Sequence, residues 1–172
     1  GIVTGIVGTK QFKISAVGMH NHAGTTPMNM RKDAGKALMR VYQQIETRFP
    51  LIAGKETVWT IGQILFHPGA PSVVPGEAEM ILQIRDPNID KLEELKNELK
   101  AIIAQKKSKF PCNLNLNIQS EISPAAMDPT LQKFVESSAK ALAPKKYLKM
   151  ASGAGHDART ISQILPTAMM FI

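Results

Sequence analysis

Apolar and polar residues alternate along several stretches of the chain, which is the pattern of a strand with one buried face. The alternation is strict over residues 113–118 and is also present over 10–19. Two more strands are expected at about 57–66 and 78–85, and the proline-rich loop HPGAPSVVPG at 67–76 separates them. The apolar members of these strands are expected to face a common core.

Two longer stretches carry apolar residues at helical spacing. One runs from about Asp33 to Thr47, and the other begins at Asp90, where Glu93 three residues later predicts a capping box. The apolar stripes are Ala34, Ala37, Leu38, Val41 and Ile45, and Leu92, Leu95, Leu99, Ile102 and Ile103. The order strand, helix, strand, strand, helix, strand predicts a ferredoxin-like βαββαβ unit over residues 9–120, with both helices on one face of an antiparallel sheet.

After Pro124 the pattern becomes that of an α/β layer, so the fold class expected for the chain is α+β. A helix is predicted at 131–142, a short strand at 147–150 and another helix at 160–165. The glycine-rich segment SGAGHDA, at 152–158, lies between the last two.

Both ends of the sequence resemble interrupted structure. GIVTGIVG at 1–8 is typical of a strand entered abruptly, and TAMMFI at 167–172 is an apolar run typical of a strand buried on both faces of a parallel sheet. We therefore expect the sequence to be an internal fragment of a longer protein.

The composition argues against several classes of protein. Hydrophobic residues make up 44% and charged residues 20% of the 172 residues, which fits a soluble globular chain with no membrane span or signal peptide. The single cysteine, Cys112, allows no internal disulfide and favours a reducing, cytoplasmic location. The net charge of +7 admits nucleic-acid binding, but two Tyr and one Trp offer little base stacking, so a solvated lysine-rich face is the preferred interpretation.

Histidine and arginine residues are the candidates for chemistry. His20 and His22 form an H-x-H pair that could chelate a metal, but no carboxylate lies nearby in sequence, so no metal is expected here. In SGAGHDA, His156 at a helix start could donate to an oxyanion, while Asp157 could cap that helix or orient the imidazole. Gly153 and Gly155 would allow tight turns and the close approach of a ligand, and the alternative is a plain glycine-rich helix entry.

Arg85 ends a strand and projects away from the apolar row of Met80, Leu82 and Ile84. A guanidinium can bind a carboxylate with two parallel hydrogen bonds. An ordinary surface arginine is the alternative, and nothing in the local pattern separates the two.

Four segments together resemble one enzyme family. NHAGTTPM (21–28), PGAPSVVPG (68–76), LQIRDP (82–87) and SGAGHDA (152–158) are similar, in order and approximate spacing, to segments of N-carbamoyl-L-amino-acid hydrolases, β-ureidopropionases and allantoate amidohydrolases. The resemblance implies a di-zinc exopeptidase-like catalytic domain of the aminoacylase superfamily with an inserted ferredoxin-like lid that also dimerises. Residues 1–8 and 121–172 would then belong to the catalytic domain, and 9–120 to the lid.

The resemblance also implies roles for individual residues. His22 is similar to the lid histidine that reaches the scissile group in the partner subunit's site, and Arg85 to the arginine that grips the substrate carboxylate. Gly155 and His156 are similar to residues of the catalytic domain that contact the substrate, so His22 and His156 are the catalytic candidates. Ser72 occupies a position where the family has asparagine; serine can still form a hydrogen bond to the substrate, but its side chain is shorter.

The family's metal ligands are absent from the sequence, so the resemblance implies two divalent metal ions, zinc or manganese, in a parent enzyme and none in this fragment, which is expected to be inactive. The implied partners are a small carbamoyl or ureido substrate with a carboxylate and a second copy of the chain, with no nucleic acid and no membrane. Two alternatives stay open: a non-catalytic dimerisation or ligand-binding module, and an aminoacylase or dipeptidase branch of the superfamily. Carbamoyl amino acids, ureidopropionate and allantoate all stay open as substrates.

Overall fold

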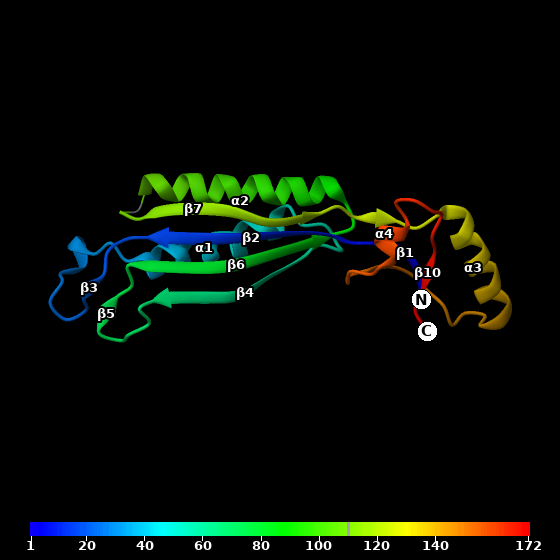
Figure 1. Ribbon diagram of the computed structural model, residues 1–172, viewed down its shortest axis with the longest axis horizontal. Coiled ribbons are helices and arrows are strands. Elements are labelled where there is room, and N and C mark those ends of the chain that lie inside the picture. Colours follow the sequence, from blue (N-terminus) through cyan, green and yellow to red (C-terminus); the bar gives the residue numbers. More distant parts are fainter. Residues whose placement is uncertain (110) are drawn as a thin grey trace.

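A four-stranded antiparallel sheet with two helices on one face forms the larger part of the computed structural model, which describes residues 1–109 and 111–172 (Figure 1). The strands are β2 (Gly8–Val17), β4 (Val58–His67), β6 (Glu77–Asp86) and β7 (Asn113–Ile122), in the spatial order β4-β6-β2-β7. The helices α1 (Ala34–Arg48) and α2 (Ile89–Lys109) contact the sheet and each other, so they share a face. The antiparallel sheet and the helices predicted from the sequence are confirmed.

The core of this part lies between the sheet and the helices. Every residue of the two predicted helical stripes is buried, together with alternate residues of the strands. Those strand residues are Phe12, Ile14, Ala16, Ala78, Met80, Leu82, Ile84 and Leu114. The opposite face of the sheet presents the intervening residues of the strands, which are mainly polar.

A β-bulge in β7 changes which side chains reach the helices. Gln11 lies opposite Ser120 and Phe12 opposite Ile118, so Gln119 is the extra residue. Simple alternation along β7 would send Glu121 to the open face. The bulge instead pairs Glu121 with Lys10, on the helix side.

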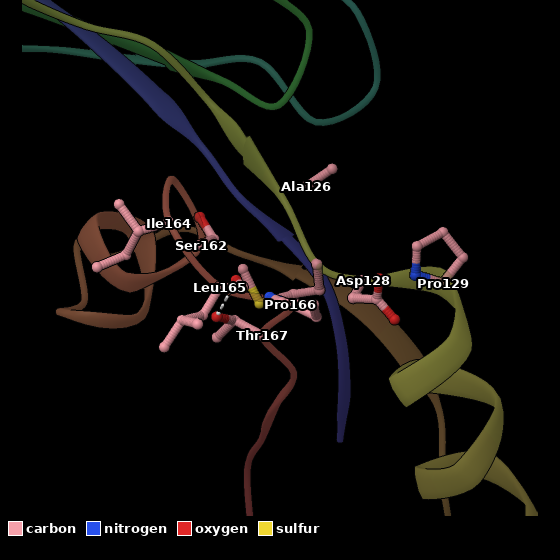
Figure 2. A pocket seen from close by; sticks show the side chains of 9 residues that line it. Ala126, Asp128, Pro129, Ser162, Ile164, Leu165, Pro166 and Thr167 are labelled. Carbon is pink, nitrogen blue, oxygen red and sulfur yellow. Dashed lines mark hydrogen bonds between the residues drawn. The ribbon is translucent and has the colours of Figure 1, made fainter.

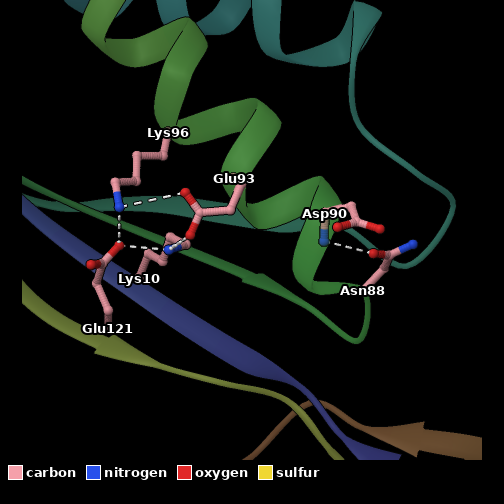
Figure 3. Close-up of polar contacts among 6 residues, drawn as sticks. All are labelled: Lys10, Asn88, Asp90, Glu93, Lys96 and Glu121. Atoms are coloured by element: carbon pink, nitrogen blue, oxygen red, sulfur yellow. Dashed lines mark hydrogen bonds and ion pairs between the residues drawn. The ribbon is translucent and has the colours of Figure 1, made fainter.

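Four charged residues meet where β2, β7 and α2 converge (Figure 3). The Nζ of Lys10, whose side chain is only 4% exposed, donates to Glu93 Oε1 at 2.6 Å and to Glu121 Oε1 at 2.5 Å. Lys96 Nζ lies 2.7 Å from Glu121 Oε1 and 3.5 Å from Glu93 Oε2. The hydrogen bond from Lys10 is the main cause that lowers the pKa of Glu93 and of Glu121.

This cluster corrects the predicted capping box. Glu93 is held by Lys10, and α2 begins one residue before Asp90. The Oδ1 of Asn88 accepts the backbone N–H of Asp90 at 2.8 Å (Figure 3), so Asn88 supplies the cap. A buried lysine competes for the carboxylate more strongly than a backbone N–H does, because its charge needs a partner.

The cluster predicts that removing its two carboxylates costs more stability than removing the Lys10 amine. Replacing Glu93 and Glu121 together by glutamine should destabilise the chain by about 3 kcal/mol, because the buried Lys10 charge loses both carboxylates. Lys10→Met should cost within about 1 kcal/mol, since the two carboxylates are 46% and 37% exposed and remain hydrated. Urea unfolding at pH 7 measures both, and a larger loss in Lys10→Met than in the double variant would contradict this account.

The difference in stability between wild type and the double variant should depend on pH. The folded-state pKa values of Glu93 and Glu121 are lowered, so their contribution is complete above the ordinary glutamate value of 4.5 and is lost as the pH falls below it. Wild type and the double variant should therefore converge in stability in acid.

The smaller part of the fold surrounds β1 (Ile2–Ile6). β9 (Lys149–Ser152) pairs with β1 in parallel, and β8 (Ala125–Ala126) and β10 (Met169–Met170) pair with it antiparallel. Two helices belong to this part, α3 (Pro129–Leu142) and α4 (Ala158–Ile161). None of the helices formed by the described residues is long and apolar enough to cross a membrane.

Two predictions for this part are wrong in detail. The TAMMFI run contributes only the two residues of β10, pairs antiparallel, and leaves Met170 59% exposed instead of burying it on both faces. An apolar run signals affinity for a core, whereas strand direction is set by the connections around it. The second helix begins at Ala158 and spans four residues, where residues 160–165 had been expected.

Candidate functional site

The lid tip, named after the lid domain expected from the sequence and defined here as residues 20–31 and 70–76, holds His22 and Ser72. The two-residue strands β3 (Asn21–His22) and β5 (Val73–Val74) pair, and the backbone N–H of Ala23 donates to the carbonyl of Ser72 at 2.8 Å. The structure therefore brings His22 and Ser72 together, although they belong to loops that are distant in sequence.

A backbone contact orients His22. The N–H of Gly24 donates to His22 Nδ1 at 3.0 Å. In the neutral ring the proton must then sit on Nε2, which is left as a donor on an exposed side chain. His22 thus presents an Nε2–H donor at the surface.

His20 has a structural task instead. Its Nδ1 accepts the N–H of Gly76 at 3.0 Å, and a Cβ at position 76 would lie 2.7 Å from the imidazole carbon Cγ. Glycine at 76 is therefore required for this contact, which ties the lid tip to the start of β6. Both histidines of the H-x-H pair use Nδ1 for backbone contacts, an arrangement that does not fit a shared metal ion.

Arg31 is a residue of the lid tip that the sequence analysis missed. Its Nε donates to the carbonyl of Thr26 at 3.0 Å and its Nη2 to the carbonyl of Ala23 at 2.5 Å, so it closes the loop around His22. The short 3-10 helix η1 (Met28–Met30) completes this loop, and a second one, η2 (Phe49–Leu51), follows α1. A basic residue four positions after Pro27 of the GTTP turn was the only sequence signal for Arg31.

Arg85 lies at the other end of β6, beside the SGAGHDA loop. Its Nη1 donates to the carbonyl of Gly153 at 2.6 Å, and its Nε donates to Gln83 Oε1 at 2.8 Å. Two of the five guanidinium N–H groups are used in these contacts, which leaves one on Nη1 and both on Nη2 for a ligand. The structure therefore joins Arg85 to the loop that carries Gly155 and His156.

Ser152 holds His156 in the loop. Ser152 Oγ lies 2.7 Å from His156 Nε2, the serine is 1% exposed, and the imidazole packs against Phe171 with ring centroids 5.7 Å apart. The roles predicted for Asp157 are wrong, because its side chain makes no capping hydrogen bond and Ser152 orients the ring. A helix of four residues also provides only a weak dipole, so the helix start adds little to this site.

The structure does not support tight turns as the reason for the glycines of this loop. Neither Gly153 nor Gly155 has a positive φ, and a Cβ at Gly153 would meet nothing within 4 Å. No tight turn therefore demands glycine here. The absence of side chains instead leaves the backbone beside Arg85 open to a ligand.

The two groups of residues lie at opposite ends of the sheet (Figure 1). β6 runs from beside the lid tip, at Glu77, to Arg85 near its far end, and its ten residues span roughly 30 Å. Within one chain, His22 and Ser72 therefore do not reach Arg85 and His156. The predicted set of site residues is split into two halves.

A surface hollow of about 440 Å³ lies between the start of α3 and the segment after α4 (Figure 2). Asp128, one of its polar linings, caps α3 by accepting the N–H of Leu131 at 2.8 Å. Its carboxylate is thus used in the fold, and the hollow contains none of the predicted site residues. Across residues 1–109 and 111–172, no group of three or more His, Cys, Asp or Glu is placed to hold a metal ion.

Comparison with known proteins gives consistent matches. The family described as a peptidase dimerisation domain matches residues 4–111. An N-carbamoyl-L-amino-acid amidohydrolase from Paenarthrobacter aurescens is 31% identical over 172 residues, and an allantoate amidohydrolase from Escherichia coli strain K12 is 30% identical over 181. In both comparisons the match covers 100% of this chain and 41% of the relative, so the chain spans about two fifths of the length of these relatives.

A solved structure is similar across nearly the same extent. The crystal structure of an amidase of the hydantoinase/carbamoylase family from Burkholderia phymatum superposes with a TM-score of 0.94 at 41% identity. The match covers 98% of this chain and 42% of that one.

Proposed function

Because the chain belongs to the family of peptidase dimerisation domains, we propose that it forms the lid and the substrate-gripping part of a larger amidohydrolase. The reaction is hydrolysis of a linear amide or ureido C–N bond in an N-carbamoyl amino acid, ureidopropionate or allantoate. The observation that carries the proposal is the hydrogen bond of Arg85 to Gly153, which joins a carboxylate-binding side chain to the His156 loop. Similarity to carbamoyl-amino-acid and allantoate amidohydrolases supports this substrate class.

Arg85 and the 152–156 loop form one half of the proposed site. The free Nη1 and Nη2 donors of Arg85 bind the substrate carboxylate with two parallel hydrogen bonds. The exposed backbone at Gly155 lies against the substrate. In this proposal Ser152 gives its single hydroxyl proton to His156 Nε2, 2.7 Å away, and not to the carbonyl of Ala154 at 3.2 Å. The neutral ring then carries its proton on Nδ1 and can donate to the oxygen of the scissile carbonyl.

His22 and Ser72 form the other half and come from the partner subunit. The roughly 30 Å between the lid tip and Arg85 supports this assignment, because one chain cannot bring both halves together. The Nε2–H of His22 is a further donor to the developing oxyanion. Ser72 supplies a hydroxyl in place of a longer amide.

The domain assignment follows the same proposal. The order β2-α1-β4-β6-α2-β7 and the strand order β4-β6-β2-β7 support a ferredoxin-like lid over 9–120. Residues 1–8 and 121–172 would be parts of a di-zinc exopeptidase-like catalytic domain. Two divalent metal ions, zinc or manganese, would be held by other segments of the parent, since the described residues offer no set of three ligands. The lone buried cysteine, Cys112, supports a reducing, cytoplasmic location.

The homodimer is proposed to form through the free edge of β4. β4 and β7 are the two edges of the sheet, and β4 is the more apolar, with Val58 55% and Leu65 38% exposed. Phe66 of β4 is also 40% exposed, whereas β7 exposes two large apolar side chains, Ile118 (41%) and Ile122 (42%), beside its asparagines. An unpaired apolar edge is a template for pairing with a second copy, which a two-fold axis would join antiparallel.

Charges placed on that edge should weaken the dimer. Val58→Lys with Leu65→Lys is expected to weaken self-association roughly tenfold or more, because like charges meet across the symmetry axis. The matched control puts two lysines on the other edge, at Asn115 and Asn117, and should leave association unchanged. Sedimentation of the full-length parent measures both, and equal effects at the two edges would exclude β4 as the interface.

The reaction itself is tested in the full-length parent enzyme. Supplied with divalent metal, it should release ammonia or the free amino acid from N-carbamoyl amino acids, ureidopropionate or allantoate. N-acyl amino acids and dipeptides should be poor substrates. Preference for either of the latter would move the protein to the aminoacylase or dipeptidase branch, and no hydrolysis of any of them would contradict the proposal.

A further inference from the structure

Three glutamines form a hydrogen-bonded row on the open face of the sheet, leading to Arg85. Gln11 Nε2 donates to Gln119 Oε1 at 2.8 Å, Gln83 Nε2 donates to Gln11 Oε1 at 2.9 Å, and Arg85 Nε donates to Gln83 Oε1 at 2.8 Å. The row therefore crosses β7, β2 and β6. Its members are partly or fully exposed, so the row does not serve to fill a core.

The direction of every bond in the row follows from Arg85. A guanidinium has donors and no acceptor, so the atom of Gln83 that faces Arg85 Nε must be the amide oxygen. The amide nitrogen of Gln83 then points to Gln11 and requires an oxygen there, and Gln11 in turn presents its nitrogen to Gln119. One cation thus fixes the orientation of three otherwise symmetric amides.

The backbone brings the row together. Gln11 and Gln83 are directly paired across β2 and β6. Gln119 is the extra residue of the β7 bulge, where Gln11 lies opposite Ser120, and this bulge lets its side chain reach sideways to Gln11. Each member needs a donor and an acceptor at the tip of a side chain long enough to meet its neighbour, which glutamine provides.

We propose that the row of Gln119, Gln11 and Gln83 is a positioning device for Arg85, which sets the substrate preference for a free carboxylate. The inference rests on the proposed carboxylate-binding role of Arg85. By engaging Nε, Gln83 holds the plane of the guanidinium, so the Nη1 and Nη2 donors are already oriented when the substrate carboxylate arrives. The other two glutamines keep the oxygen of Gln83 turned toward Arg85.

The test uses the full-length enzyme and compares an N-carbamoyl amino acid with its primary carboxamide. Gln83→Met should raise KM for the acid about tenfold with kcat nearly unchanged, since one hydrogen bond to a charged group is lost. Gln11→Met should have a smaller effect and Gln119→Met the smallest. For the carboxamide, KM should stay level, so the preference for acid over amide falls in that order.

Charged substitutions at Gln11 distinguish an effect transmitted through the row from a direct electrostatic effect on the substrate carboxylate. Gln11→Glu keeps an acceptor for Gln83, whereas Gln11→Lys offers only a donor, which turns the Gln83 nitrogen toward Arg85 and breaks that contact. The row therefore predicts a higher KM for the acid in the lysine variant than in the glutamate variant. An added charge acting alone predicts the reverse, because lysine attracts a carboxylate and glutamate repels it.

Matched controls decide what a negative result means. Gln43→Met, an exposed glutamine of α1, should leave KM and the acid preference unchanged. If Arg85→Ala lowers the acid preference but Gln83→Met does not, the row is not a positioning device and the role of Arg85 stands. The same conclusion follows if Gln11→Glu has a higher KM for the acid than Gln11→Lys. If Arg85→Ala itself leaves the preference intact, the proposed function of Arg85 fails first.

Discussion

Arg85→Ala in the full-length parent enzyme is expected to raise KM for a carboxylate substrate roughly 30- to 4,000-fold, which corresponds to about 2–5 kcal/mol. The cost is large because the substrate carboxylate would enter the site without its paired donors. The effect should fall mainly on KM, since the contact is equally present before and during the reaction. Steady-state kinetics with an N-carbamoyl amino acid give the measurement.

Two further variants are compared with Arg85→Ala. Arg85→Lys should recover only part of the affinity, because lysine keeps the charge but loses the planar fork and the Nε contact to Gln83. Lys13→Ala removes another cation from the same face of the sheet, one that pairs with Glu79 at 2.5 Å, and should change KM within about twofold. Wild-type kinetics in Arg85→Ala would dismiss Arg85 as the carboxylate ligand.

The helices and the core were readable from the sequence because burial imposes a period. The stripes of α1 and α2 are buried as predicted, and Phe12, Ile14 and Ala16 alternate into the same core. Such patterns record which side of an element is apolar, and the four-stranded antiparallel sheet follows from the order of the elements. Local pattern and tertiary structure agree wherever one face of an element is simply buried.

The errors arose where a residue distant in sequence overrode the local pattern. Glu93 satisfied the rule for a capping box, but the buried amine of Lys10, 83 positions away, takes its carboxylate. The bulge at Gln119, which puts Glu121 on the helix side of the sheet, was not predicted, since no composition rule marks a bulge without a glycine. Pairing partners across strands are needed to see either feature.

The candidate site was predictable as a list of residues and not as an arrangement. Arg85 and the His156 loop come together through the carbonyl of Gly153, a backbone atom that no side-chain pattern reveals. Ser152, which holds His156, sat inside the motif but had no assigned role. The separation of His22 from His156 follows from the length of β6, which the sequence indicated, once the antiparallel order of the strands is known.

That separation leads to the prediction with the most distinctive outcome. His22→Ala and His156→Ala should each lower kcat in the parent enzyme by about 100- to 1,000-fold, since each proposed donor meets charge that develops on the carbonyl oxygen. Mixing the two inactive variants should restore activity. In a heterodimer, one site combines His156 of the His22→Ala chain with the intact His22 of the other chain, whereas the second site lacks both.

Recovery up to about half the wild-type rate per heterodimer is then expected, because one of the two sites is complete. The matched control mixes His22→Ala with a chain that carries both substitutions. It forms the same kind of dimer but offers no intact His22 to any site, so it should stay inactive. If confirmed heterodimers of the first mixture also stay inactive, His22 does not act across the dimer, and the roughly 30 Å along β6 would leave it without a role in catalysis.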